Sequence, residues 1–122
     1  MKIGFIDYYL DEWHANNYPK LIAKASGGAH EVCCAYAHIE PPAEMNLRSN
    51  AQWSKDYGVE LVDSIEEVIA RSDCLVVLSP DNPEMHELLC QLPLASGKRT
   101  YIDKTFSPDK ATAERIFAHA EK

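Results

Sequence analysis

The chain has 122 residues, which is enough for one packed domain but short for an enzyme with a separate substrate-binding domain. Hydrophobic residues make up 46% and charged residues 25% of the sequence, a mixture typical of globular proteins rather than of disordered or fibrous ones. The formal net charge is -7 and no cluster of lysine or arginine stands out, so nucleic acid is not an expected partner.

The chain begins with an apolar run at residues 2–6 that is typical of a buried strand. No apolar run in the sequence reaches the length of a signal sequence or of a membrane span. We therefore expect a cytoplasmic protein without a membrane partner.

The sequence has four cysteines, all in apolar stretches and none in a Cys-x-x-Cys pair: Cys33, Cys34, Cys74 and Cys90. This spacing favours neither a zinc site nor a disulfide framework. We interpret the cysteines as reduced thiols of the core, and we predict no metal site.

Five short apolar runs, rich in valine, isoleucine, cysteine and tyrosine, predict β-strands. They are residues 2–6, 31–36, 59–62, 74–78 and 99–102. Most of these runs are continuously apolar rather than alternating, as expected for a parallel sheet that is covered on both faces.

Helices are predicted between these strands and after the last one. The first is expected over about residues 12–26 and the second over residues 51–57. The third is marked by Ser64 and Glu67, which are spaced as a capping box at a helix start.

The fourth predicted helix has Asn82 as its N-cap and Pro83 at its first position, and Gly97 is expected to end it. Its expected core residues are Met85, Leu88, Leu89 and Leu92. The last helix repeats this pattern with Ser107 as N-cap and Pro108 in first position. Its expected core residues are Ala113, Ile116, Phe117 and Ala120.

Strands that alternate with helices through right-handed crossovers predict a doubly wound α/β fold of the Rossmann-like kind. We expect a mostly parallel sheet of about five strands with helices on both faces, in a single domain over residues 1–122. Ligands bind such sheets beyond the carboxyl ends of the strands, where the strand order reverses. The site is therefore expected near Asp7, Tyr36, Ser79 and Asp103.

Four segments carry a resemblance to a known family through their order along the chain. They read KDYGV at residues 55–59, SIEEVI at 64–69, DCLVVLSP at 73–80 and GKRTYIDK at 97–104. The sequence resembles the amino-terminal nucleotide-binding domain of the Gfo/Idh/MocA oxidoreductases over essentially its whole length. The resemblance implies NAD or NADP as cofactor and a sugar-like or polyol molecule as substrate. The substrate domain of the family is absent from these residues, so the chain alone is expected to be inactive.

The resemblance also implies a catalytic residue after the fifth strand. Family members carry a Glu-Lys-Pro triplet there, whose lysine reaches the nicotinamide and the substrate hydroxyl. The matching residues here are Asp103, Lys104 and Thr105. Lys104 is therefore expected to donate a hydrogen bond to an alkoxide-like oxygen during hydride transfer. A solvated lysine at a strand end is the alternative interpretation.

The loop after the fourth strand is expected to line the cofactor groove with Ser79, Pro80 and Asn82. His86 follows at a position where the family often has a histidine, and it is expected to shape this loop. A histidine bonded to the backbone at a helix start is the alternative.

The first turn of the predicted fold departs from the dinucleotide-binding pattern. Such a turn needs glycines so that the backbone can approach a pyrophosphate at the N-terminus of the following helix. Here no glycine is present, and Tyr8 and Tyr9 stand beside the acids Asp7, Asp11 and Glu12. These carboxylates are expected to repel a pyrophosphate, so ordinary dinucleotide binding through this turn is not predicted.

The end of the second strand departs from the pattern as well. It normally carries an acid for the ribose hydroxyls, whereas this chain has Tyr36 and His38 and no acid before Glu40. Tyr36 could stack on an adenine and His38 could meet a phosphate, but both residue types are common at strand ends.

Two functions remain open from the sequence. One is the cofactor domain of an NAD(P)-dependent oxidoreductase, with Lys104 as its catalytic contact. The other is a non-catalytic binding module that kept the fold, lost dinucleotide binding and uses the aromatic stretch from Tyr8 to Tyr18 for a protein or a small ligand. An exposed sheet edge would favour pairing with a second copy, with a partner or with a missing carboxy-terminal domain.

Overall fold

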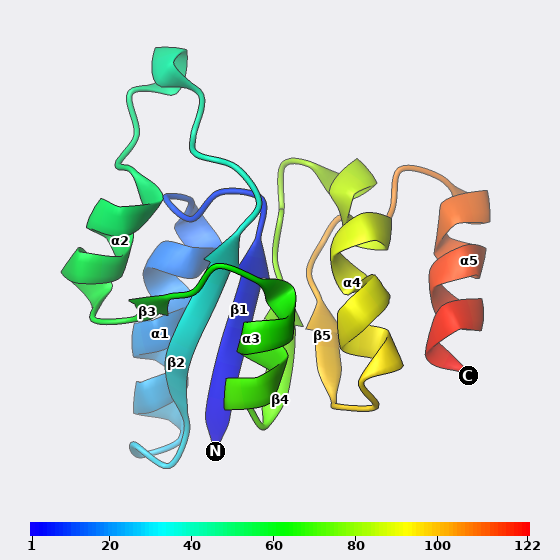
Figure 1. The fold of residues 1–122 in the computed structure, drawn as a ribbon, viewed down its shortest axis with the longest axis horizontal. Coiled ribbons are helices and arrows are strands. Elements are labelled where there is room, and N and C mark those ends of the chain that lie inside the picture. Colours follow the sequence, from blue (N-terminus) through cyan, green and yellow to red (C-terminus); the bar gives the residue numbers. More distant parts are fainter.

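Five parallel strands form the centre of the computed structural model, which describes residues 1–122 (Figure 1). The order across the sheet is β3-β2-β1-β4-β5. The strands are β1 (Lys2–Asp7), β2 (Glu31–Ala37), β3 (Glu60–Leu61), β4 (Cys74–Val77) and β5 (Thr100–Ile102). Every predicted strand is present within one or two residues of its expected ends, and the predicted parallel, doubly wound sheet is confirmed.

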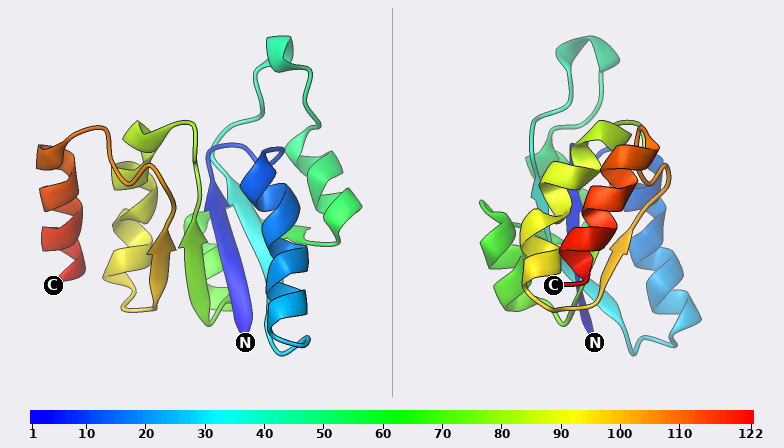
Figure 2. Two further views of the ribbon diagram at one scale, coloured as in Figure 1. Left: turned by 180° about the vertical axis from the view of Figure 1, so that it is seen from behind. Right: turned by 90° about the vertical axis from the view of Figure 1, so that its right-hand side faces the viewer.

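Helices cover both faces of this sheet, as predicted (Figure 2). The helices α1 (Trp13–Ala25) and α2 (Asn50–Tyr57) lie on one face, and α3 (Ile65–Arg71) and α4 (His86–Ala95) on the other. The last helix, α5 (Lys110–Ala120), packs against α4 on the β5 side of the molecule. Two short 3₁₀ turns, η1 (Ala43–Met45) and η2 (Pro83–Met85), complete the structure. No helix is both long enough and apolar enough to span a membrane.

The sheet separates two apolar layers, because side chains alternate along each strand. Phe5 of β1 packs with Trp53 of α2 in one layer, and Ile6 packs with Val68 of α3 in the other. Gly4 also belongs to the α3 side, where a Cβ atom would overlap Ser72 Oγ and Val68 Cγ1. Glycine at this position therefore lets α3 approach the sheet closely.

The predicted helix start at Asn82 and Pro83 is confirmed in position, but its first turn is a 3₁₀ turn rather than α-helix. Asn82 is the N-cap residue of η2 and Pro83 its first residue, the Asn82 side chain makes no capping bond, and α4 follows directly at His86. A 3₁₀ turn has fewer residues per turn than an α-helix, so it changes which side chains of the following helix face the core. Leu88 and Leu92 are consequently exposed, and His86, Leu89, Cys90 and Pro93 are the buried residues of α4.

The predicted start of the last helix is wrong. Its N-cap is Asp109, whose side chain accepts a hydrogen bond from the backbone N–H of Thr112 at 2.7 Å, and Ser107 stands two residues before it. Thr112 and Ile116 are the buried residues of α5, while Phe117 is 60% exposed and Ala120 is exposed too. Because α5 packs chiefly on α4, a narrow apolar stripe is sufficient.

The capping prediction for α3 is confirmed in one of its two bonds. Ser64 Oγ accepts from the backbone N–H of Glu67 at 3.1 Å, whereas the Glu67 side chain pairs with Arg71 instead of returning to Ser64. All four cysteines are free, with Cys34 and Cys90 buried and the other two half-buried.

Candidate functional site

The strand order reverses between β1 and β4, and the residues that follow these two strands meet at the carboxyl edge of the sheet. The backbone N–H of Ser79, after β4, donates to Asp7 Oδ1 at 2.9 Å. The backbone N–H of Asp103, after β5, donates to the carbonyl of Val77 at 2.9 Å. Three of the four predicted edge residues, Asp7, Ser79 and Asp103, therefore lie at one place, and the fourth, Tyr36, lies one strand away on β2.

Asp7 lies inside this edge rather than on its surface. Its side chain is 1% exposed, and Oδ1 accepts from the backbone N–H groups of Tyr8 and Ser79 while Oδ2 has no hydrogen-bond partner. Burial raises the pKa of Asp7 well above its ordinary value, and the neighbouring Glu12 carboxyl raises it further. The sequence placed the Asp7 carboxylate among the charges that face a pyrophosphate, whereas its contacts with Tyr8 and Ser79 hold it buried beneath the turn.

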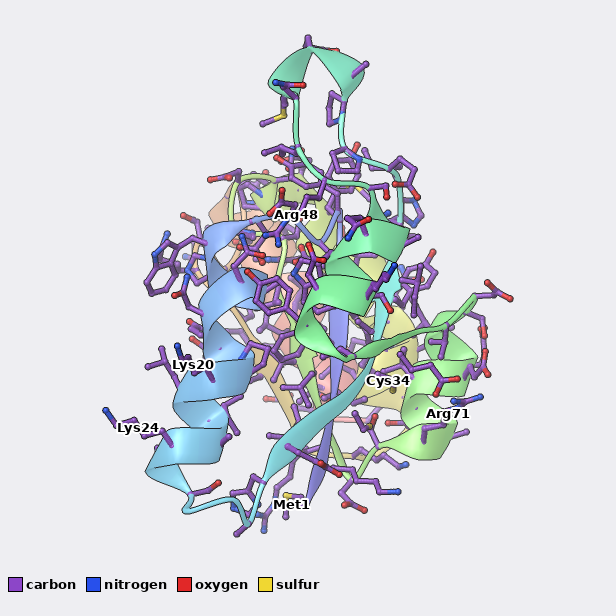
Figure 3. The ribbon with its side chains drawn as sticks, turned by 90° about the vertical axis from the view of Figure 1, so that its left-hand side faces the viewer. Met1, Lys20, Lys24, Cys34, Arg48 and Arg71 are labelled. Carbon is purple, nitrogen blue, oxygen red and sulfur yellow. The ribbon has the colours of Figure 1, made fainter.

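Asp11 binds side chains of the protein, because its Oδ1 accepts from the Asn16 side chain of α1 at 2.9 Å as well as from Arg48. Arg48 pairs with it at 2.7 Å and lowers its pKa to about 2, and the backbone N–H of Arg48 donates to its other oxygen. Figure 3 shows Arg48 between the upper ends of α1 and α2. The charge of Asp11 is thus compensated within the protein.

Glu12 alone of the three predicted acids occupies the start of α1. It is the N-cap, with Oε2 accepting from the backbone N–H of His14 at 2.6 Å and Oε1 accepting from that of Ala15 at 2.9 Å. These are the helix N-terminal donors that a Rossmann-like fold offers to an anion. In this structure the protein's own carboxylate takes them.

The turn between β1 and α1 is filled by its own side chains. Leu10 is fully buried and its backbone N–H donates to Asn50 Oδ1 at 3.0 Å, and Tyr9 is only 7% exposed. The space enclosed between this turn and the Ser79–Asn82 loop leaves no room for a water molecule. Ser79 has a left-handed backbone with φ of 59°, and its hydroxyl donates to the carbonyl of Asn82, so the loop also closes on itself.

His14 joins the turn to the end of β5. Its Nδ1 lies 3.1 Å from Glu12 Oε2, and its Nε2 lies 3.5 Å from Asp103 Oδ2. Asp103 is almost fully buried and also accepts from the Tyr101 hydroxyl at 3.2 Å. From the sequence, His14 was expected only as part of the aromatic stretch from Tyr8 to Tyr18. Its position beside the cap Glu12 follows from the start of α1 at Trp13.

No group of three or more histidine, cysteine, aspartate or glutamate side chains is arranged to hold a metal ion. The acids and the histidine at the carboxyl edge instead form pairs with one another and with backbone N–H groups. The chemistry available there is therefore hydrogen bonding and proton sharing.

No protein-family model matches the sequence, and no curated protein sequence matches it either. Solved structures do match the fold. UDP-N-acetylglucosamine 3-dehydrogenase GnnA from Acidithiobacillus ferrooxidans superposes with a TM-score of 0.72 at 16% identity, over 99% of this chain and 35% of that one. The dehydrogenase MviM from Clostridium difficile gives 0.69 at 21% identity, over 99% of this chain and 36% of that one.

The 3-ketoreductase KijD10 from Actinomadura kijaniata, in complex with NADP and TDP-benzene, gives a TM-score of 0.67 at 22% identity. That match covers 99% of this chain and 34% of KijD10. The chain has the Rossmann-like fold of these oxidoreductases. The resemblance to the Gfo/Idh/MocA nucleotide-binding domain is therefore confirmed at the level of the fold. The chain spans about a third of the length of these neighbours.

Lys104 follows β5 at the carboxyl edge and is exposed. Its ammonium group makes no hydrogen bond or ion pair with the rest of the protein, although the adjacent Asp103 is firmly held. The peptide bond between Lys104 and Thr105 is cis. Lys104 is thus the cation at this edge that remains free to contact a ligand, while its catalytic role stays a prediction.

His86 is fully buried at the start of α4. Its Nδ1 lies 2.9 Å from the carbonyl oxygen of Phe106, and its Nε2 contacts the carbonyl oxygen of Leu78. Both ring nitrogens face backbone carbonyl oxygens, and a neutral imidazole donates to one of the two. A histidine bonded to the backbone at a helix start is the alternative that the sequence left open. His86 ties the loop after β4 to the segment after β5 and shapes the edge from within, whereas Pro80 and Asn82 are partly exposed on that loop.

Tyr36 and His38 at the end of β2 form a separate group. The Tyr36 hydroxyl lies 3.1 Å from His38 Nδ1, and the ring of Tyr8 stacks on His38 with a centroid distance of 6.2 Å. These aromatic rings contact one another across the ends of β1 and β2. Their predicted contacts with an adenine or a phosphate remain predictions.

Proposed function

We propose that this chain is the cofactor domain of an NAD(P)-dependent oxidoreductase that acts on a sugar-like or polyol substrate. The observation that carries the proposal is Lys104, an exposed and unpaired cation two residues after β5 on the carboxyl edge of a Rossmann-like fold. The matching solved structures include a dehydrogenase of a sugar nucleotide and a ketoreductase with bound NADP, which supports the same reaction class.

The pyrophosphate of a dinucleotide does not fit the turn as it stands. Glu12 takes the N-terminal N–H groups of α1, and Tyr9 and Leu10 fill the turn. We therefore assign to this chain only the polar contact of Lys104. Its ammonium group would donate a hydrogen bond to the substrate oxygen and stabilise the negative charge that develops there.

The test uses the longest natural chain that carries this domain, with a panel of polyols and sugars and both nicotinamide cofactors. We expect nicotinamide reduction, and we expect Lys104→Met to lower kcat on the order of 100-fold because a charge-stabilising donor is lost. Lys20→Met is the matched control, since Lys20 lies in the middle of α1 away from this edge (Figure 3). Absence of turnover, or full activity in Lys104→Met, would contradict the proposal.

The filled turn favours a second candidate function, a non-catalytic binding module that kept the fold. Calorimetry with NADH and NADPH separates the two, together with the fluorescence of Trp13, which is 62% exposed beside the turn. Trp53 is fully buried and serves as an internal reference. No binding at millimolar cofactor favours the binding module, whereas micromolar binding favours the oxidoreductase domain.

A further inference from the structure

The N-terminus of α1 is the point at which this structure disagrees with a dinucleotide-binding domain. A helix start with free backbone N–H groups attracts an anion, because the donors and the helix dipole both point outward. In this chain the N–H groups of His14 and Ala15 bind the side chain of Glu12. These two backbone N–H groups are therefore not free to bind the phosphate group of a ligand.

We infer that Glu12 is a specificity-determining residue whose carboxylate occupies the position of a phosphate group at α1 and so limits the affinity of this edge for phosphate-bearing ligands. The inference rests on the proposed function only for the identity of the ligand, a dinucleotide. Glu12 competes as an intramolecular anion, and a ligand phosphate must replace it to gain the same donors.

The position of Glu12 is secured by more than the capping bonds. His14 Nδ1 lies 3.1 Å from Oε2, and the same imidazole reaches Asp103 on the neighbouring segment with Nε2. The Glu12 side chain is almost fully buried. Because these contacts would all be disturbed when Glu12 leaves, the carboxylate is a strong competitor rather than a loosely held surface group.

A second observation points to the same place. Asp7 is 1% exposed, and its Oδ2 has no contact with a hydrogen-bond donor, because its neighbour is the Glu12 carboxyl group. Two adjacent carboxyl groups can bond only by sharing a proton, so removal of Glu12 leaves this buried oxygen without its neighbour. Burial raises the pKa of Asp7, and its protonated form would donate a hydrogen bond to a phosphate oxygen once Glu12 is gone.

The other acids of this region do not compete in the same way. Asp11 is compensated by Arg48. Asp81 is exposed on the loop after β4, across the closed space from Glu12, and it touches none of the α1 donors. Asp81 therefore supplies a matched control for the removal of one negative charge at the same edge.

The experiment compares Glu12→Ser and Asp81→Ser with the unaltered chain. The probes are ADP-ribose and inorganic pyrophosphate, measured by calorimetry. Serine is a favourable N-cap, so helix α1 keeps a cap while the larger carboxylate is removed. We expect Glu12→Ser to lower the Kd for ADP-ribose by roughly tenfold or more, the effect of freeing hydrogen bonds to a charged group. Asp81→Ser should change it by less than about threefold, the effect of a screened surface charge.

Two outcomes would overturn the inference: a Glu12→Ser chain that binds both probes no more tightly than the unaltered chain, or an equal gain in Asp81→Ser. Circular dichroism checks folding, and Glu12→Gly replaces Glu12→Ser if the latter does not fold, because glycine is tolerated as an N-cap and leaves the backbone donors of α1 free. A gain for ADP-ribose with no nicotinamide turnover by the longest natural chain supports the inference and contradicts the proposed function. Turnover without any gain overturns the inference and leaves the proposed function in place.

Discussion

The buried side chain of Asp7 joins two strand ends at the carboxyl edge of the sheet, and its protonation affects how stable that edge is. Its Oδ1 accepts from Ser79 and so joins the ends of β1 and β4, whereas its Oδ2 lies beside the Glu12 carboxyl, with which it can bond only by sharing a proton. A buried charge in this position would be unfavourable, and the raised pKa of Asp7 reflects this cost. The residue therefore stabilises the edge best in its protonated form.

We predict that Asp7→Asn flattens the pH dependence of stability. The folded protein holds the Asp7 proton more tightly than the unfolded chain, whose pKa is the ordinary 3.8, so the free energy of unfolding falls as pH rises from 3.8 through the raised value. Asparagine keeps the Oδ1 acceptor and offers an N–H donor to Glu12. At neutral pH the variant should be more stable than the unaltered chain by about 1–3 kcal/mol, the usual cost of a buried polar group that lacks a partner.

Urea denaturation between about pH 4 and pH 8 measures this effect across the titration range of a raised carboxyl group. Asp63→Asn is the matched control, since Asp63 is exposed. A variant at Asp7 that is less stable than the unaltered chain at neutral pH, with an unchanged pH profile, would contradict the prediction.

The location of the residues at the carboxyl edge was predictable from the sequence, but their burial and contacts were not. Asp7, Ser79 and Asp103 could be placed together because the carboxyl ends of parallel strands share one edge. Which carboxyl groups are buried depends on partners far away in the sequence. Arg48 compensates Asp11 from 37 residues away, and Asn50 holds the backbone of Leu10 from 40 residues away. No local pattern encodes such contacts.

At the scale of elements, the packing of α3 on β1 depends on the absence of a side chain at Gly4. Ser72 and Val68 occupy the space that a Cβ atom would take. We predict that Gly4→Ala lowers the free energy of unfolding by about 1–3 kcal/mol, the usual cost of overpacking.

Urea denaturation of Gly4→Ala, Val68→Ala and the double variant tests the cause. The two changes together should cost less than the sum of the separate costs, because Val68→Ala removes the overlap of the new methyl group with Val68 while the one with Ser72 remains. Additive costs would show that the overlap with Val68 is not a source of the loss.

The existence of each helix was predictable from the sequence, but the 3₁₀ geometry before α4 and the exact start of α5 were not. Asn82-Pro83 and Ser107-Pro108 both have the composition of an N-cap followed by proline, and that composition also suits a 3₁₀ turn or an extended lead-in. Packing decides between these outcomes. His86 is fixed by carbonyl groups of Leu78 and Phe106, so α4 begins where this histidine is held.

At the scale of the whole molecule, the order of the strands follows from right-handed crossovers, which is why the fold class could be predicted. The uneven covering of the sheet by its helices could not be predicted from the sequence. Helix α1 lies over β1 and β2, and the same face of β4 and β5 is left partly bare, with Tyr101 54% exposed (Figure 2). An apolar strip runs there between α1 and β5, formed by Tyr18, Leu21, Ile22, Ala25, Val76 and Tyr101.

The position of α5 leads to a prediction about local stability. This helix is joined to the domain chiefly through α4, by Ile116 in the core and by an ion pair of Arg115 with Glu87 at the surface. Surface ion pairs add little to stability, and few apolar contacts hold the helix. We therefore expect the backbone amides of α5 to exchange with solvent deuterium faster than those of β1, which pairs with two strands.

Hydrogen exchange of two variants tests the cause of this difference. Asp109→Ala removes the N-cap of α5 and should speed exchange throughout α5 by roughly threefold to tenfold, as expected for the loss of a helix cap. It should leave β1 unchanged, because α5 opens without the sheet. Ser107→Ala is the control, since the Ser107 hydroxyl bonds only to the carbonyl of Asp109 and caps no helix N–H group. If Asp109→Ala speeds exchange in β1 as much as in α5, the helix opens only with the whole domain, and α5 is then an integral part of the core rather than its least stable element.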